Sequence, residues 1–299
     1  MNILAKTNIR FKLIDTFYII MMILPLAFGM VINTLTKPLS EGITLKGARI
    51  FFTIPMPIQN LPITEAQVNS ALVVITVLFF CLYMTHGISE HIKLKRQHFA
   101  ELIVEKVDGL VVANMGEHFK GYSSFIIAIM ALSAVSSLSS LLGLFPPTSD
   151  LNILGGWALL VFILITYYKL KCGPLYYLKG FTQPIAVLAP INFISEFATP
   201  VSMSFRHYGN ILSGTVISTL IAAGLSGLSA MLLKFLPGFL SEIPWLQIGI
   251  PAVLSIYFDV FSGCLQAFIF AMLTMLNVSG AFDIDEFKKR KTKKLAINK

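Results

Sequence analysis

Apolar residues gather in six long runs along the chain, separated by shorter polar stretches. The runs cover about residues 13–32, 68–86, 122–144, 153–168, 185–235 and 246–277. A helix needs about 20 mostly apolar residues to cross the hydrocarbon core of a bilayer. The pattern therefore predicts an all-α membrane protein with about six membrane helices, folded as a single integral membrane domain over residues 1–299.

The last two runs are too long for simple crossings. Residues 185–235 as one helix extend about 75 Å, against a hydrocarbon core of about 30 Å. The run therefore either breaks near Pro190 or Pro200 or lies strongly tilted. Residues 246–277 are also overlong, so the sequence predicts two long, tilted, adjacent helices that can wrap a neighbouring surface.

Residues 98–119 have a different pattern from the six runs. Apolar side chains at Phe99, Ile103, Val107, Leu110, Val111 and Met115 fall on one helical face. Acidic residues fall elsewhere on the same helix. This predicts an amphipathic helix that lies on the cytoplasmic surface of the membrane rather than crossing it.

Composition agrees with a membrane protein, because 56% of the residues are hydrophobic and only 13% are charged. Soluble domains carry about 25% charged residues. The net charge of +8 is concentrated, with seven of the 23 Lys and Arg in the last twelve residues. That distribution indicates membrane orientation and argues against nucleic acid as a partner.

Charge alternates between the loops. Lys and Arg are frequent in the N-terminal segment, in loops 87–121 and 169–184 and in the tail, whereas loops 145–152 and 236–245 have none. The positive-inside rule then places both termini in the cytoplasm. The first run, with its basic start, also has features of a signal peptide, but it shows no clean cleavage site. We expect it to be retained as a helix, with removal as the alternative.

Few polar residues interrupt the runs. Between Lys179 and Lys234 the only residues with a full charge are Glu196 and Arg206. Charged residues inside membrane segments are costly and are usually functional. The alternative is a structural ion pair of Arg206 with Glu196 or with Asp259.

Two helices each supply a polar stripe. Ser202, Arg206 and Asn210 are spaced by four, so they share one helix face. In the last run Asp259 and Gln266 are seven residues apart, again on one face. Neighbouring His207 lies about 100° around the helix from Arg206, which favours a structural role for it.

The chemistry of these groups favours ion translocation. Arginine stays protonated, so it can repel cations or keep a carboxylate ionised but cannot relay protons. Asp259 and Glu196 can exchange protons or coordinate an ion. A fixed cation between two such carboxylates suggests two aqueous half-paths separated by a barrier.

Two other function classes compete with this interpretation. A self-contained transporter or channel can use an intramembrane arginine to bind an anionic substrate, although no internal repeat supports it. A membrane enzyme lacks support, because the sequence shows no nucleophile–base pair, metal motif or phosphate loop. We therefore expect no cofactor and no metal site.

Two segments resemble a known family. The stretch "EFATPVSMSFRHYGNILSG" resembles the signature around the essential arginine of subunit a in bacterial F-type ATP synthases. The stretch "GCLQAFIFAMLTML" resembles the last helix of the same subunit, and "LLGLFPPTSDLN" and "MPITEAQVNS" also look like bacterial members. The similarity covers about residues 50–280, which leaves 1–49 as an N-terminal extension and 281–299 as a basic cytoplasmic tail.

The resemblance implies a mechanism. Subunit a is the non-catalytic membrane stator beside a ring of c subunits, and it contacts peripheral-stalk subunit b and other synthase subunits in the bacterial plasma membrane. Arg206 matches the family arginine that faces the ring carboxylates. Asn210 and Gln266 match residues of the external half-channel, Glu196 matches the acidic residue of the cytoplasmic half-channel, and Ser202 lies near it. The ion, H⁺ or Na⁺, is left open.

The chain departs from the family pattern at its acidic group. Many members carry glutamate nine residues after the arginine, where this chain has Thr215. Seven residues before the glutamine this chain has Asp259. The acidic group of the external path is thus expected on the facing helix.

Overall fold

The computed structural model describes residues 2–36, 47–57, 59–88, 95–183, 185–232, 246 and 249–297. Within these residues, six helical stretches are long and apolar enough to cross a membrane. They are Phe11–Thr36, Glu65–Thr85, Glu117–Leu142, Leu151–Cys172, Ala189–Leu232 and Ile250–Gly280. Each overlaps one of the six predicted runs, so the all-α membrane fold is confirmed. The predicted external loop 236–245 lies outside the described residues.

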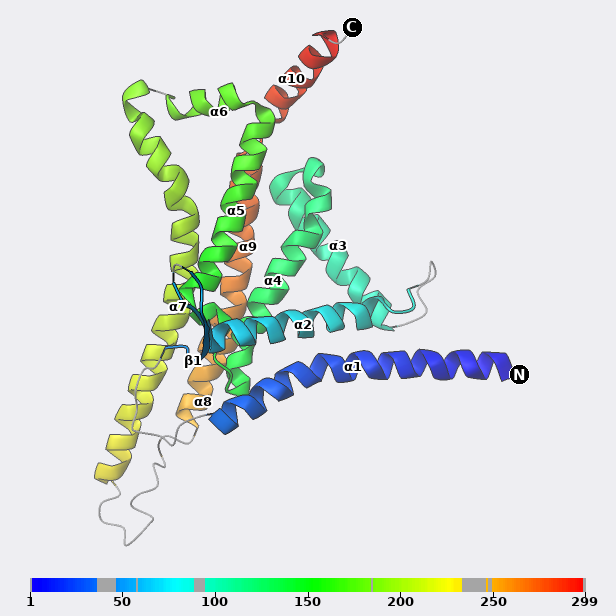
Figure 1. Ribbon diagram of the computed structural model, residues 1–299, viewed down its shortest axis with the longest axis vertical. Helices are drawn as coiled ribbons and strands as arrows, with labels where there is room; N and C mark the ends of the chain where they lie inside the picture. The colour runs from blue at the N-terminus through cyan, green and yellow to red at the C-terminus, as the bar shows by residue number, and fades with distance from the viewer. Residues whose placement is uncertain are drawn as a thin grey trace. The chain divides into compact units, whose positions relative to one another are not determined.

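The helices pack into two compact units. Unit 1 comprises Met1–Ile103, Ala131–Asp150 and Gly209–Ala267, and unit 2 comprises Val104–Met130, Leu151–Tyr208 and Phe268–Lys299. The helices of the spans are labelled in Figure 1: α1 (Asn2–Thr36), α2 (Glu65–Thr85), α4 (Ser123–Leu138), α5 (Leu151–Cys172), α7 (Ala189–Leu232), α8 (Ile250–Ser255) and α9 (Gly263–Gly280). The shorter elements are β1 (Ile50–Ile54), β2 (Leu61–Thr64), α3 (Lys95–Met115), α6 (Pro174–Phe181) and α10 (Ile284–Ile297), with 3₁₀ turns η1 (Glu117–Tyr122), η2 (Ser139–Leu142), η3 (Pro147–Ser149) and η4 (Ala186–Leu188).

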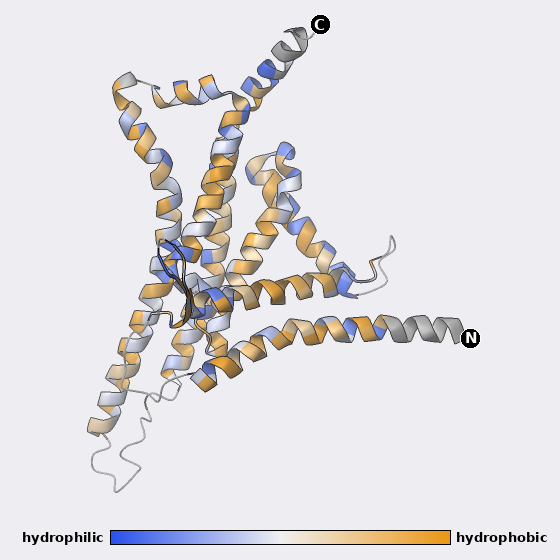
Figure 2. Ribbon diagram, in the orientation of Figure 1, coloured by the Kyte–Doolittle hydropathy of each residue, from blue (hydrophilic) through white to orange (hydrophobic). Residues whose placement is uncertain are grey.

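The hydropathy of the residues differs between the membrane helices and the other elements. Figure 2 shows hydrophobic residues along most of α1, α2 and α5, and hydrophilic residues in the coloured part of α10. The predicted amphipathic segment forms α3, which is not one of the six candidate spans among the described residues. In unit 2, Val111 and Met115 of α3 are buried, and Val107 and Leu110 pack against the same core.

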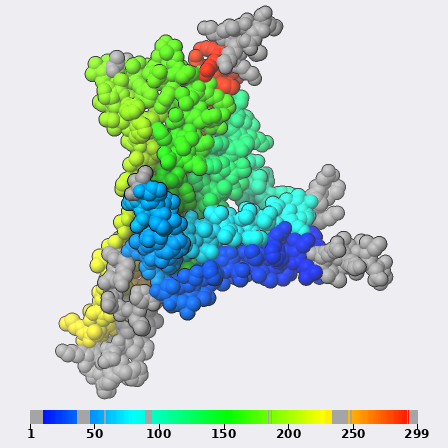
Figure 3. All heavy atoms as spheres, in the orientation of Figure 1, coloured from blue at the N-terminus to red at the C-terminus, as the bar shows by residue number. Residues whose placement is uncertain are grey.

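In unit 1, α1 and α2 pack side by side (Figure 3). A small antiparallel hairpin, β1–β2, leads directly into α2, and it was not predicted from the sequence. A capping box starts α2: the Thr64 hydroxyl accepts a bond from the Gln67 backbone N–H, and the Thr64 N–H donates to the Gln67 side chain. Capping satisfies backbone donors that the first helical turn leaves open.

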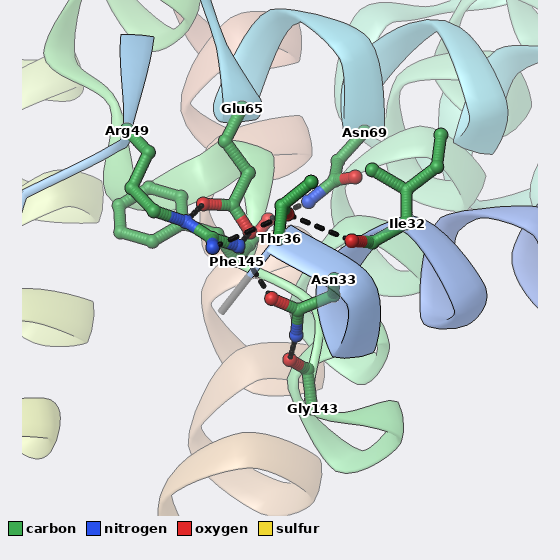
Figure 4. A network of polar contacts seen from close by, with 8 residues as sticks. All are labelled: Ile32, Asn33, Thr36, Arg49, Glu65, Asn69, Gly143 and Phe145. Carbon is green, nitrogen blue, oxygen red and sulfur yellow. Dashed lines mark hydrogen bonds and ion pairs between the residues drawn. The ribbon is translucent and has the colours of Figure 1, made fainter. Parts of the chain in front are cut away.

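A polar network joins the C-terminal end of α1 to the start of α2 (Figure 4). Arg49 binds the Glu65 carboxylate through two nitrogens, at 2.8 and 3.0 Å. Asn33 on α1 accepts a bond from Arg49 and donates one to the Gly143 carbonyl, each 2.5 Å long. Asn69 on α2 donates to the Phe145 carbonyl at 2.9 Å. The network therefore fastens the loop around residues 143–145 to both helices.

The core of unit 2 is a cluster of buried apolar side chains from α3, α4, α5, α7 and α9. Its members include Val111, Ile126, Val161, Met203, Phe270 and Met275. Phe119 belongs to this cluster too, and the rings of Tyr168 and Phe282 pack against it, with the three ring centroids 5.2 to 5.7 Å apart. The cluster fixes the relative positions of α5 and of the residues of α7 and α9 in this unit.

The two overlong runs take different forms. The fifth is the single helix α7, which continues through Pro200, so a break at that proline does not occur. Pro190 lies in its first turn, where a proline is tolerated. The sixth contains a π-helical segment, η7 (Ile256–Ser262), between α8 and α9. In this segment, which contains Asp259, the helical hydrogen bonds join residues five positions apart instead of four.

Candidate functional site

Unit 1 contains a cavity of about 230 Å³ between the C-terminal part of α7 and the π-helical segment η7. Its wall is mainly apolar, and the polar groups in it are the carboxylate of Asp259, the amide of Asn210 and several hydroxyls. The hydroxyls belong to Ser137, Ser140, Thr215, Ser218, Thr219 and Ser255. Such a lining can hold water and a single cation near one carboxylate.

Close helix packing shapes this cavity. A Cβ atom on Gly214 would lie 3.0 Å from the Phe258 ring, and one on Gly263 would lie 2.6 Å from the Ser137 Cβ. Both values are tighter than ordinary contact, so the helices approach because these positions lack side chains. Small residues also dominate the segment 133–140, in which Ser133, Ser136 and Ser137 are buried.

Asp259 and Asn210 both face the cavity, and each has a local partner. The Ser255 hydroxyl donates a short hydrogen bond to the Asp259 carboxylate. The Asn210 side-chain amide donates to the Ser262 hydroxyl at 2.6 Å, which links α7 to η7. Gln266, one turn past the π-helical segment, is only 6% exposed and is not in the lining of this cavity. Asp259 therefore lines this cavity, whereas Gln266 is packed within the protein.

Glu196 lies in unit 2 and forms an ion pair that the sequence did not predict. The Lys169 ammonium is 2.5 Å from one Glu196 oxygen, and the Tyr177 hydroxyl is 3.5 Å from the other. Burial raises the pKa of Tyr177, and the Glu196 charge raises it further. Glu196 thus has Lys169 as its partner rather than Arg206.

Two cavities adjoin this pair, with volumes of about 310 and 200 Å³. The larger one extends to Thr199 and Asn277, and the smaller one to Tyr176 and Asp283. They share a wall that includes Lys169 and Glu196. Space for water around a carboxylate is what an ion path requires.

Ser202 and Arg206 are exposed on α7, next to the exposed side chains of Val201 and Phe205. An exposed arginine within a membrane span is costly unless a polar partner covers it. Neighbouring His207 is fully buried and packs against the Phe270 ring at 5.9 Å. The spacing argument for a structural His207 thus agrees with its burial.

Sequence reasoning missed several residues of these sites. Lys169 stood in a basic loop and was interpreted only as an orientation signal. Thr215 was noted only as the position that lacks the family glutamate. Thr215, Ser218 and Thr219 are spaced by three and four, so they share a helix face with one another, and that spacing was the available signal.

Comparison with known proteins places these features in a family. The family model for the ATP synthase A chain matches residues 68–279. A protein of Desulforamulus reducens named ATP synthase subunit a is 33% identical over 208 residues, which cover 68% of this chain and 73% of that one. A sodium ion specific ATP synthase subunit a of Propionigenium modestum is 28% identical over 289 residues, 86% of this chain and 91% of its own. The chain therefore belongs to the ATP synthase subunit a family, the non-catalytic multi-pass membrane subunits of bacterial F-type ATP synthases.

Proposed function

We propose that this chain translocates ions beside a c-subunit ring, through one half-channel from the outside and one to the cytoplasm. In this mechanism an ion enters from outside, neutralises a ring carboxylate, travels with the ring and leaves on the cytoplasmic side. Family membership supports the stator role and argues against a self-contained transporter. The ring and subunit b are the partners that this role requires.

The cavity around Asp259 and Asn210 is the proposed external half-channel. Its single carboxylate can exchange a proton or contribute to binding of a partly hydrated Na⁺. Gln266 matches a residue of this path in the family, and its burial beyond the π-helical turn suits an end of the path inside the protein. The cavities around Glu196 are the proposed cytoplasmic half-channel, with Ser202 further along α7.

Arg206 is the proposed barrier between the two paths. It follows Glu196 and precedes Asn210 on one continuous helix, and its charged group is exposed. This exposure is the observation that carries the proposal, because the exposed charge needs a polar partner in the membrane. A ring carboxylate supplies that partner, and the permanent charge of Arg206 keeps it ionised until an ion arrives.

The proposed orientation of the chain in the membrane follows from the distribution of Lys and Arg among its loops. Basic loops and the basic tail place both termini in the cytoplasm. On this orientation the segment Gly173–Thr182, with Glu196 close to it, lies at the cytoplasmic side. Asp259, in the first half of the last span, lies nearer the outside.

ATP-driven ion pumping in inverted membrane vesicles tests the proposal. The variant is Arg206→Ala, and Phe205→Ala is the matched control because it removes an adjacent exposed side chain without charge. Assembly of each variant is verified by recovery of the complete complex. We expect the assembled Arg206→Ala complex to lose pumping and Phe205→Ala to retain it. Pumping by Arg206→Ala at the wild-type rate would overturn the mechanism.

The same vesicles distinguish the two ions. The name of the Propionigenium modestum relative specifies sodium, whereas that of the Desulforamulus reducens relative specifies no ion. Pumping in nominally Na⁺-free buffer identifies H⁺ as the ion, and a strict Na⁺ requirement identifies Na⁺.

A further inference from the structure

We propose that Lys169 is a gate residue that closes the cytoplasmic half-channel by pairing with Glu196, and that ion exit requires this pair to open. The inference rests on the proposed function, since it assigns a role to the wall between two cavities of that half-channel. It concerns a lysine at the end of α5, outside the set of residues that the family resemblance pointed to.

The pair lies where the two cavities meet. Both cavities are lined by Lys169, Glu196 and Asn192. Beyond this shared wall the larger cavity reaches Thr199, one helical turn further into the span, whereas the smaller one reaches residues of the segment after α5. The Lys169–Glu196 contact therefore stands in the wall that separates the two cavities, on the direct line from one to the other.

The contact closes this passage in the structure. The Lys169 ammonium and the Glu196 carboxylate are 2.5 Å apart, which leaves no room for water between them. Tyr177 covers the pair from α6: its ring centroid is 5.6 Å from the ammonium, and its hydroxyl is 3.5 Å from the carboxylate. The positive charge of Lys169 also opposes the passage of a cation.

The exposure of its two side chains allows the same contact to open. The Lys169 side chain is 31% exposed, whereas that of Glu196 is 8% exposed. A lysine at the end of a span can therefore move its ammonium to water on a flexible stem while the carboxylate stays in place.

The backbone of α7 supports such movement. Pro200 stands four residues after Glu196 inside the helix, so the Glu196 carbonyl lacks the helical N–H that it would otherwise accept from. A missing helical bond at this position makes the turn that carries Glu196 easier to deform than the rest of the helix.

A matched control lies two residues along the chain. The Lys171 ammonium is 5.5 to 5.8 Å from the ring centroids of Tyr167, Tyr168 and Phe287. Lys171 is not in the lining of either cavity. Lys171→Gln thus removes the same charge from the same helix end without touching the proposed gate.

Thiol labelling of the assembled complex tests the gate without ion transport. The native cysteines at 81, 172 and 264 are replaced, and Thr199→Cys places a thiol in the larger cavity. A membrane-impermeant maleimide is added at the cytoplasmic face of inverted vesicles. Labelling is compared for the parent and for Lys169→Gln, Lys169→Arg and Lys171→Gln, after normalisation to total reactive thiol in denatured protein.

We expect Lys169→Gln to label faster, and Lys169→Arg and Lys171→Gln to label at the parent rate. If the closed pair is populated at about 90%, its removal raises the labelling rate about tenfold. Because Lys169→Gln leaves Glu196 without its partner, the double variant Lys169→Gln/Glu196→Gln is measured as well and should also label fast.

The other outcomes overturn the inference in distinguishable ways. Equal labelling of all variants means that the pair does not control access, which overturns the gate and leaves the half-channel intact. A thiol that stays unlabelled in every variant means that water does not reach Thr199 from the cytoplasm. That result overturns the gate and the proposed cytoplasmic path together, whereas the Arg206→Ala pumping experiment addresses the barrier separately.

Discussion

Arg49 and Glu65 form a bidentate ion pair at the start of α2. Arg49 Nε is 2.8 Å from Glu65 Oε2, and Arg49 Nη2 is 3.0 Å from Glu65 Oε1. The Glu65 side chain is only 7% exposed, whereas that of Arg49 is 25% exposed. The hydrogen bonds to Glu65 raise the pKa of Arg49. The planar guanidinium suits this geometry, because its two N–H groups match the two carboxylate oxygens.

Arg49→Ala should destabilise the subunit strongly. It leaves Glu65 buried without its partner, which costs about 3–5 kcal/mol in comparable buried pairs. Arg49→Lys retains the charge but loses the bidentate hydrogen bonding, so we expect a smaller loss of stability. Thermal unfolding of the purified subunit measures both variants, with the exposed Lys12 changed to Ala as the control. An Arg49→Ala protein that unfolds at the wild-type temperature would contradict the structural role of the pair.

The same network predicts that α1 stays in the assembled subunit. Asn33 and Thr36 on its last turns bind Arg49, and Asp15 near its start binds Arg96 at 2.7 Å. Removal of the first helix would take away the Asp15 carboxylate that pairs with Arg96 and the Asn33 and Thr36 side chains that bind Arg49 beside Glu65. Peptide mapping of the purified complex should therefore recover residues 13–32, and their consistent absence would favour the signal-peptide alternative.

The sequence predicted the spans well because their signal is local. Six apolar runs marked the six candidate spans, and spacing by four placed Ser202 and Arg206 on one exposed face of α7. Predicting the π-helical turn at Asp259 was not possible, because one extra residue per turn leaves no pattern in a short apolar segment. Asp259 lies within this turn and lines the cavity, whereas Gln266 lies beyond it and does not.

Pairings between distant segments were also beyond the sequence. Lys169 and Glu196 are 27 residues apart along the chain. Arg49 and Glu65 are brought together by the short β1–β2 hairpin, whose sequence has no strong strand or turn pattern. Charge patterns identify which side of a membrane a lysine prefers, but not which carboxylate it contacts. The partners of Glu196 and Glu65 therefore emerged only from the packed structure.

Asp283 caps the helix α10 at its N-terminal end. Its side chain accepts bonds from the backbone N–H groups of Asp285 and Glu286, at 3.0 and 3.2 Å, and from the Tyr176 hydroxyl at 2.8 Å. Asp283→Ala should remove the cap, which costs about 1 kcal/mol. Hydrogen exchange at the first amides of α10 should then rise about fivefold. Asp285→Ala is the control, and equal exchange in the two variants would argue against the cap.

The cap should also depend on pH. The backbone N–H of Glu286, followed by the Tyr176 hydroxyl, lowers the pKa of Asp283 below its ordinary value of 3.8. A lowered pKa means that the stabilisation is complete above about pH 4 and is lost as the pH falls through the folded-state value. The bond to Asp283 raises the pKa of Tyr176 above 10.0, so that bond persists at pH 10 and is lost at higher pH. Exchange in α10 should thus be slow across the neutral range and should rise first in acid.

The position of the acidic group in the unit 1 cavity offers the sharpest test of the external half-channel. Thr215 and Asp259 line the same cavity from α7 and from η7. If the path needs one carboxylate there, Asp259→Ser should lower ATP-driven pumping by at least roughly tenfold, as loss of a proton-transfer group does. Thr215→Glu in the same chain should then restore much of the rate, because it returns a carboxylate to the same space. Ser218→Glu serves as a second placement on the cavity wall, and Thr215→Glu alone controls for the added charge.

Pumping is measured in inverted vesicles with equal amounts of assembled complex. Full pumping by Asp259→Ser would show that the path needs no carboxylate in this cavity, whereas lost pumping without rescue from either position would tie the function to the π-helical turn itself.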